Sequence, residues 1–219
     1  ETDRRLNWLS VGAEQDVGLV STSGMCSVEA QEKEGSACFR QFDGRNYTGN
    51  AVARNGPVRA GRGPSRLVIG YERVVFYQSS LGLRAGWAFA GEGPTLRGAA
   101  PFVPWSVALR ASHWFGHDPF AHSGWRPFVF MTAGYAQFDV KTQVRVREDP
   151  TKYDLQGGND LEQTLDAYKR AGDGFAGLGA GVSFAPTSGS ALGAEIAVLE
   201  AFPFGATVIA PSLSATVGF

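Results

Sequence analysis

The sequence predicts an all-β protein: an eight-stranded antiparallel up-and-down transmembrane β-barrel with a short extracellular helix. Three observations support this fold class. Eight segments alternate apolar with small or polar residues, the charged fraction is low while glycine and aromatic residues are abundant, and long connections alternate with short ones. At this length, residues 1–219 are expected to form one barrel domain.

Composition narrows the class of protein. Charged residues make up 19% of the chain, below the roughly 25% of ordinary soluble domains, while 29 glycines and 12% aromatic residues are high values. A net charge of −1 argues against a nucleic-acid partner. The sequence contains no run of 18 apolar residues, so it predicts no transmembrane helix. A transmembrane barrel is instead signalled by alternation of apolar and polar residues. The first ten residues lack a signal-peptide pattern, so residue 1 is expected to begin a mature chain or to follow an upstream domain.

Each of the eight segments has the two-residue period of a strand. In order, they span 8–20, 66–77, 80–91, 104–114, 127–146, 175–186, 192–200 and 209–219. In 80–91, for example, Leu81, Leu83 and Trp87 alternate with Gly82 and Arg84. An even number of such segments favours closure into an antiparallel barrel.

The polar face indicates which side is inside. A soluble barrel would expose Lys, Glu, Thr and Gln, but here that face consists mostly of Gly, Ser and Ala with isolated charges. We therefore expect the small and charged residues in the lumen and the apolar face toward lipid, where in 127–146 it would include Phe128 and Phe130. The predicted lumen charges are Glu14, Asp16, Glu72, Arg84, Arg110, Asp139, Lys141, Arg145 and Glu195. Such charges must pair, so they are expected to fill the lumen rather than line a wide pore.

The connections give independent support. Long connections are expected at 20–65, 90–104 and 147–172, with a shorter one at 200–206 on the same end, and short turns at 78–80, 115–125 and 186–190. Outer-membrane barrels have long extracellular loops and short periplasmic turns. Within 147–172 the sequence predicts a helix capped by Asn159, with Leu161, Leu165 and Tyr168 on one face.

Few residues suggest chemistry. Cys26 and Cys38 are expected to form a disulfide in an oxidising compartment, worth roughly 3 kcal/mol, with two free thiols as the alternative. His113, His117 and His122 lie in a turn-rich segment and predict no metal site. Ser112 and His113 are strand neighbours that point to opposite faces, so they predict no catalytic pair. No cofactor is expected.

The chain ends on a phenylalanine within a regular alternating strand. Together with the eight segments, this ending resembles the small outer-membrane barrels of the OmpA, OmpX and OmpW type. The resemblance implies a multi-pass protein of the bacterial outer membrane. It also implies that the last strand is an insertion signal for the barrel-assembly machinery, carried by Leu213, Ala215, Val217 and Phe219.

The predicted function is that of a non-enzymatic envelope anchor or a surface-interaction and assembly component. A narrow channel for small or hydrophobic solutes is the alternative, and a lipid-modifying enzyme and a soluble ligand-binding barrel are further ones. Expected partners are outer-membrane lipid, lipopolysaccharide, and a protein at the extracellular loops or in the periplasm. Arginines of the first long loop suit lipopolysaccharide phosphates or an acidic partner: Arg40, Arg45, Arg54, Arg59 and Arg62. A solvated loop that binds no ligand is the alternative.

Overall fold

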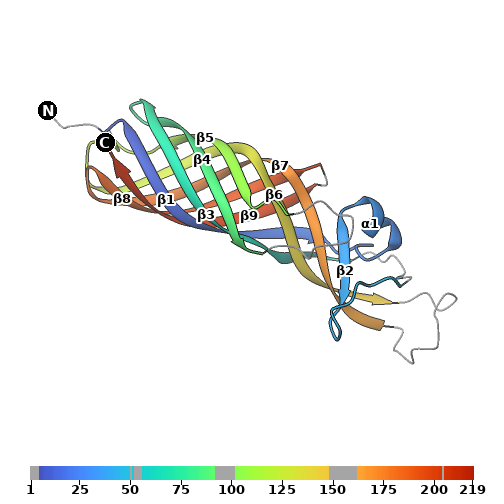
Figure 1. Ribbon diagram of the computed structural model, residues 1–219. Coiled ribbons are helices and arrows are strands. Elements are labelled where there is room, and N and C mark those ends of the chain that lie inside the picture. The colour runs from blue at the N-terminus through green and yellow to red at the C-terminus, as the bar shows by residue number, and fades with distance from the viewer. Residues whose placement is uncertain (1–4, 50, 52–55, 92–101, 148–161, 204) are drawn as a thin grey trace.

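The protein is a closed antiparallel β-barrel in a computed structural model that describes residues 5–49, 51, 56–91, 102–147, 162–203 and 205–219. The strands pair in the order β1-β3-β4-β5-β6-β7-β8-β9, and pairing of β9 with β1 closes a ring of eight (Figure 1). A ninth strand, β2, pairs with β7 and lies outside the ring. The predicted fold class is confirmed.

The strands differ greatly in length. Their bounds are Asn7–Ser21 for β1, Ser36–Arg40 for β2, Val58–Phe76 for β3, Ser79–Ala90 for β4, Trp105–Trp114 for β5, Gly124–Arg147 for β6, Glu162–Thr187 for β7, Ser190–Phe202 for β8 and Ala206–Gly218 for β9. Strands β6 and β7 have 24 and 26 residues, whereas β5 has 10. About 9–11 tilted residues cross a bilayer, so β6 and β7 are more than twice as long as a crossing requires.

The outer surface of the barrel is apolar. Along β4, Leu81 and Leu83 are exposed, while the intervening Gly82 and Arg84 are half-buried on the lumen side. The same alternation on the other strands leaves these large side chains exposed: Leu9, Val11, Leu67, Ile69, Val107, Leu109, Val129, Met131, Leu178, Val182, Leu192, Ile196, Val198, Leu213 and Val217. A belt of this kind would be unstable in water and matches a lipid environment.

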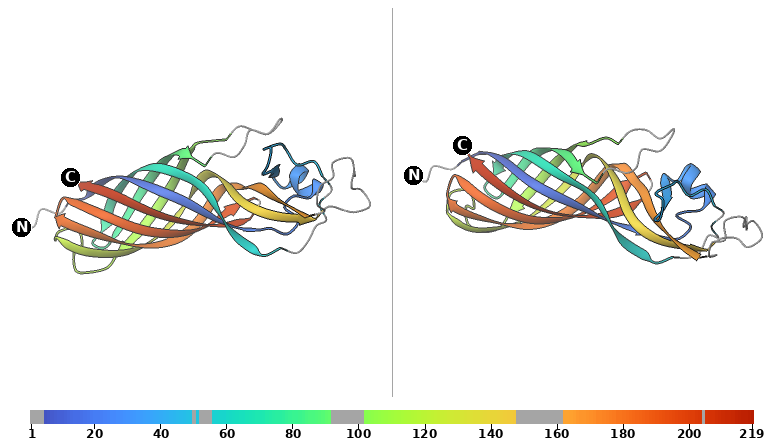
Figure 2. Two further views of the ribbon diagram at one scale, coloured as in Figure 1. Left: turned by 90° about the horizontal axis from the view of Figure 1, so that it is seen from below. Right: turned by 60° about the horizontal axis from the view of Figure 1, so that its bottom comes forward.

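Beyond the ends of β4 and β5, the longer strands continue as a second structure, which we call the extension (Figures 1 and 2). It consists of residues 16–49 with β2, residues 56–65 of β3, residues 136–147 of β6 and residues 162–174 of β7. Backbone pairing of Arg62 with Lys141 joins β3 directly to β6 there. Val20, Val140 and Leu165 form part of its apolar core.

The first long connection is ordered within the extension. Helix α1, Val28–Lys33, begins at Ser27, whose hydroxyl accepts a hydrogen bond from the backbone of Ala30. The Cys26–Cys38 disulfide, which the sequence predicted, is confirmed and joins this helical segment to β2. Cys38 is fully buried.

The prediction of a helix within 147–172 is wrong for the part of this segment that the structure describes. Asn159 and Leu161 lie outside the described residues, but residues 162–172 belong to strand β7. Leu165 and Ala167 are both fully buried at a two-residue spacing, and their backbone is paired with β6 on one side and β2 on the other. Pairing on both sides outweighs the weak helical propensity of the segment.

The prediction that Phe128 and Phe130 of β6 face lipid is also wrong. Phe128 and Phe130 point into the lumen and are buried, whereas Val129 and Met131 face outward. A Cβ atom at Gly179 or Gly181 on the neighbouring strand β7 would overlap these rings. The glycines therefore make room for two aromatic side chains inside the barrel.

Candidate functional site

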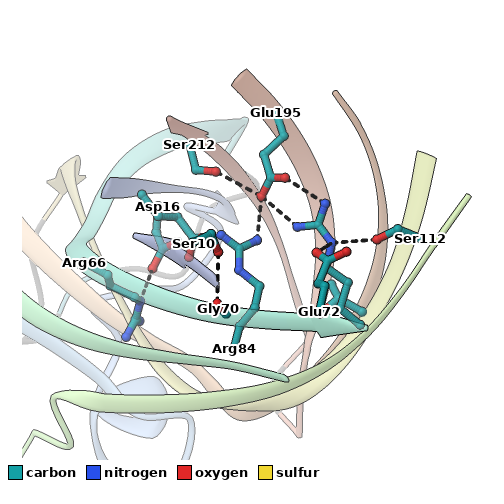
Figure 3. Close-up of polar contacts among 12 residues, drawn as sticks. Ser10, Asp16, Arg66, Gly70, Glu72, Arg84, Ser112, Glu195 and Ser212 are labelled. Atoms are coloured by element: carbon teal, nitrogen blue, oxygen red, sulfur yellow. Dashed lines mark hydrogen bonds and ion pairs between the residues drawn. The ribbon is translucent and has the colours of Figure 1, made fainter. Parts of the chain in front are cut away.

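The middle of the lumen holds an ion-pair network centred on Glu195 (Figure 3). Arg110 donates two hydrogen bonds to its carboxylate, with Nη1–Oε1 and Nη2–Oε2 distances of 3.0 and 2.8 Å. Arg84 donates to the same Oε1, and the hydroxyl of Ser212 donates to it at 3.0 Å. Glu195 is thus held by two guanidinium groups and a hydroxyl from three other strands.

Glu72 and Glu14 extend this network. The Arg110 Nε atom lies 3.3 Å from Glu72 Oε1, and Ser80 donates to the other Glu72 oxygen at 2.6 Å. Arg84 Nη2 lies 4.0 Å from Glu14. Cross-strand neighbours are small: Gly82, for example, pairs with both Glu72 and Arg110. Small residues opposite long charged ones let the charges meet at the barrel axis.

A separate ion pair lies where the barrel meets the extension. The Arg66 Nε atom donates to Asp16 Oδ2 at 3.0 Å, and both side chains are 1% exposed. Arg66 also donates to the backbone carbonyl of Gln137 at 2.7 Å and lies over the ring of Phe138. Arg66 was not among the predicted lumen charges, although its position one residue before the outward Leu67 places it on the inward face.

Aromatic side chains fill the remaining lumen. The guanidinium carbon of Arg110 lies 3.7 Å from the ring centroid of Phe130, a cation–π contact. At the end of the barrel that carries both chain termini, Phe120 from the turn 115–123 packs against Trp8 and Trp114. Phe120 is 3% exposed, so this turn folds into the barrel mouth.

Three predicted lumen charges lie elsewhere. Asp139 is buried in the extension, where it accepts hydrogen bonds from Gln137 and lies 3.5 Å from Arg170 Nε. Lys141 and Arg145 are exposed on the outside of the extension, which corrects the prediction that they face the lumen. The register of β6 shifts between Tyr135 and Asp139, so strict alternation could not be carried through this strand.

Lys141 takes part in a polar contact that joins the end of β2 to β6 and β7. Its ammonium lies 2.9 Å from Asp166 Oδ2, and Gln41 donates to Asp166 Oδ1 at 3.0 Å. The hydrogen bond from Gln41, followed by that from Lys141, lowers the pKa of Asp166 below its ordinary value. The hydrogen bond to Asp166 raises the pKa of Lys141. Both side chains are charged at neutral pH and hold each other in place.

The final strand faces outward with its apolar side. Leu213, Val217 and Phe219 are exposed, as is the smaller Ala215 between them. Backbone hydrogen bonds between Asn7 and Phe219 pair the last residue with β1. The last strand therefore seals the barrel against the first.

The histidine-rich turn forms no recognisable reaction centre. Ser112 faces the lumen and contacts Arg110, whereas His113 faces outward, where its Nδ1 atom lies 3.3 Å from the hydroxyl of Ser79. The Nδ1 atom of His122 contacts the backbone carbonyl of Asp118. Across the described ranges, no group of three or more metal-ligating side chains is found.

Among the residues that the structure describes, no helix is long and apolar enough to span a membrane. The strands, however, form a closed ring with an apolar belt, a polar and filled lumen, and exposed aromatic side chains near its two rims. These include Trp87, Phe89 and Trp105 at the long-loop end and Trp125, Phe184 and Phe219 at the other. This architecture defines a transmembrane β-barrel of the outer-membrane type, and the long-loop end is the extracellular one in that class.

Solved structures similar to this chain share little sequence identity with it. No protein-family model and no curated protein sequence matches the chain. Neisserial surface protein A is 13% identical over 97% of each chain, with a TM-score of 0.45. The attachment invasion locus protein Ail of Yersinia pestis is 11% identical over 99% of each chain, with a TM-score of 0.45. The N-terminal barrel domain of Pseudomonas aeruginosa OprF is 12% identical over 94% of this chain and 96% of that domain, with a TM-score of 0.39.

Proposed function

We propose that this protein is a non-enzymatic anchor of the outer membrane that presents the extension at the cell surface for contact with another macromolecule. The observation that carries the proposal is the length of β6 and β7, which continue far beyond a membrane crossing. They build the apolar core of the extension, which is continuous with Phe128 and Phe130 in the lumen. The Cys26–Cys38 disulfide and the added strand β2 make this region rigid. A rigid, membrane-distal surface suits specific binding better than a loose loop does.

The content of the lumen supports an anchor rather than an open pore. Side chains block the barrel at three levels: the Asp16–Arg66 pair, the Glu195 network, and the aromatic cluster around Phe120. The charged groups of the Asp16–Arg66 pair and of the Glu195 network are paired, so removing water from them costs less than for an isolated charge.

Lipopolysaccharide is the proposed lipid partner of the extension. Arg59 and Arg62 on β3 and Lys141 and Arg145 on β6 are all exposed on its outer side, above the aromatic rim marked by Trp87. Arginine forks suit phosphate oxygens. Arg54 lies outside the described residues. Replacing Arg59 and Arg62 by Gln is expected to reduce the lipopolysaccharide that copurifies, whereas Lys33→Gln, on the exposed face of α1, is the control that leaves it unchanged.

The last strand is proposed to direct assembly. Leu213, Ala215, Val217 and Phe219 form a continuous outward stripe that the barrel-assembly machinery could read before the barrel closes. Deleting Phe219 is expected to lower the amount of folded protein in the outer membrane. Ala215→Val keeps the stripe apolar and serves as the control.

The anchor proposal is tested by capturing the tagged protein from detergent-extracted envelopes and identifying stoichiometric partners by mass spectrometry. A true partner of the extension is lost when the exposed tip residue Phe42 is changed to Ser, and is retained in the lumen variant Arg84→Gln. Loss with both variants, or no partner in any preparation, contradicts the proposal.

A narrow channel is the second candidate function. The observation in its favour is that the Glu72 and Arg84 side chains are 20% and 16% exposed within the lumen, so water reaches part of the network. Planar bilayer recordings of the purified protein decide between the two. Steady conductance that changes with Arg84→Gln or Arg110→Gln would establish the channel, and a silent bilayer would exclude it.

A further inference from the structure

Arg126 is a buried cation without a carboxylate partner. It lies near the terminus-bearing end of the barrel, at the start of β6, and is only 4% exposed. Its Nη2 atom donates to the backbone carbonyl of His122, and its Nε atom has no hydrogen-bond partner. Among the described residues, no carboxylate oxygen lies within 4 Å of its nitrogens. A buried charge of this kind is costly unless something binds it.

The guanidinium of Arg126 lies in the wall of a cavity. Its central carbon is 5.4 Å from a ring centroid of Trp8, and Trp114, Phe120 and Phe128 line the same cavity. The aromatic walls come from β1, β5, β6 and the turn 115–123. Serine and threonine side chains and four further charged groups line the rest of the cavity. Aromatic walls with a few convergent polar groups are the usual form of a small-molecule site.

The other charged groups of the cavity are already engaged. Glu72 and Glu195 line it, but both contact Arg110, and Glu195 also contacts Arg84. From the adjoining turn, His122 contributes its backbone carbonyl to Arg126. Arg126 is thus the cation of this cavity that is left for an external anion.

We propose that this cavity binds a small carboxylate anion with an apolar body, held by the guanidinium of Arg126 and by the faces of Trp8 and Trp114. A carboxylate would supply a charge-assisted hydrogen-bond acceptor to this guanidinium, whose Nε atom now has no partner. The aromatic walls favour an apolar body over a fully hydrated ion such as phosphate. This binding site is independent of the extension and of the proposed surface partner.

The cavity volume is about 60 Å³, so acetate is a suitable probe. Its binding to the detergent-solubilised full chain can be followed by tryptophan fluorescence and saturation-transfer NMR. We expect saturable binding to the wild type and at least about tenfold weaker binding to Arg126→Gln, since hydrogen bonds to charged groups contribute about this much. Arg145→Gln, which changes an exposed arginine of the extension, is the matched control and keeps wild-type affinity. Inorganic phosphate should fail to displace acetate.

A second variant protects the test against a folding defect in Arg126→Gln. Ser183 pairs directly with Arg126 across β6 and β7, is buried, and lines the same cavity. Ser183→Asp should supply the missing carboxylate from within the chain, raise the unfolding temperature and abolish acetate binding. Equal acetate binding to the wild type, Arg126→Gln and Ser183→Asp, or no saturable binding to the wild type, would overturn the proposal. Displacement by phosphate at low concentration would overturn its apolar component.

Discussion

Arg110 and Glu195 form a two-point ion pair across the lumen, with N–O distances of 2.8 and 3.0 Å between side chains that are 4% and 9% exposed. The residues lie on β5 and β8, which are not neighbours in the ring. The pair therefore links two non-adjacent strands across the lumen, in addition to the hydrogen bonds between neighbouring strands.

Removing one partner of this pair should destabilise the barrel strongly. Glu195→Gln leaves Arg84 and Arg110 buried with too few carboxylates, and loss of one partner of a buried pair costs about 3–5 kcal/mol. Urea unfolding in lipid vesicles, followed by tryptophan fluorescence, measures the change. Glu200→Gln on the same strand is the control, because Glu200 is exposed and should change stability by less than about 0.5 kcal/mol. Equal unfolding free energies of the two variants would show that the Arg110–Glu195 pair does not stabilise the barrel.

The disulfide should stabilise the extension and leave the barrel unaffected. Replacing Cys26 and Cys38 by Ser is expected to cost about 2–4 kcal/mol locally, because the bond restricts the unfolded loop. Limited proteolysis should then cut within residues 22–49, while the membrane-embedded fragment stays intact and heat-modifiable on a gel. Protease resistance equal to that of the wild type contradicts this prediction.

Close packing of β1 against β6 should tolerate no added methyl group. A Cβ atom at Gly18 would overlap the γ-carbons of Val140, which is buried at 1% exposure. Gly18→Ala should therefore cost about 1–3 kcal/mol, as overpacking does. Val140→Ala removes the two overlapping atoms, so the double variant should be more stable than the sum of the single changes predicts. Hydrogen exchange of the extension measures both effects, and strict additivity would contradict the stated contact.

The attachment of β2 should weaken in acid. The pKa of Asp166 is lowered in the folded protein, first by Gln41 and then by Lys141, relative to an unfolded value near 3.9. The contribution of Asp166 is therefore fully present above that unfolded value and is lost as the pH falls through the lower folded value. Proteolysis with an acid-active protease should show β2 released below about pH 4. In Asp166→Asn this pH dependence should be absent, and an unchanged profile would contradict the assignment.

Alternation of apolar and polar residues predicted the barrel because every strand of its wall has one face toward lipid and one toward the lumen. The Cys26–Cys38 bond could be predicted for a similar reason, since two cysteines in one short segment leave few alternatives. Most of the predicted lumen charges do lie inside, and Arg66 could have been added from the register of Leu67 alone.

The extension could not be predicted, because its structure depends on contacts between distant segments. Residues 162–172 read as helical in isolation but form a strand once β6 and β2 pair on either side. Lys141 and Arg145 were misplaced because the register of β6 shifts after Tyr135. Phe128 and Phe130 were assigned to lipid because only the three-dimensional structure shows the glycines of β7 opposite them.

The central claim, a membrane-spanning barrel with the extension outside the cell, is tested most directly by labelling single cysteines in intact cells with a membrane-impermeant maleimide. The native cysteines are disulfide-bonded and should not react. Phe42→Cys in the extension should label in intact cells, Gln78→Cys in the short β3–β4 turn only after permeabilisation, and Leu83→Cys in the apolar belt in neither case. Labelling of Gln78→Cys but not Phe42→Cys in intact cells would reverse the orientation, and labelling of Leu83→Cys would contradict a membrane-spanning barrel.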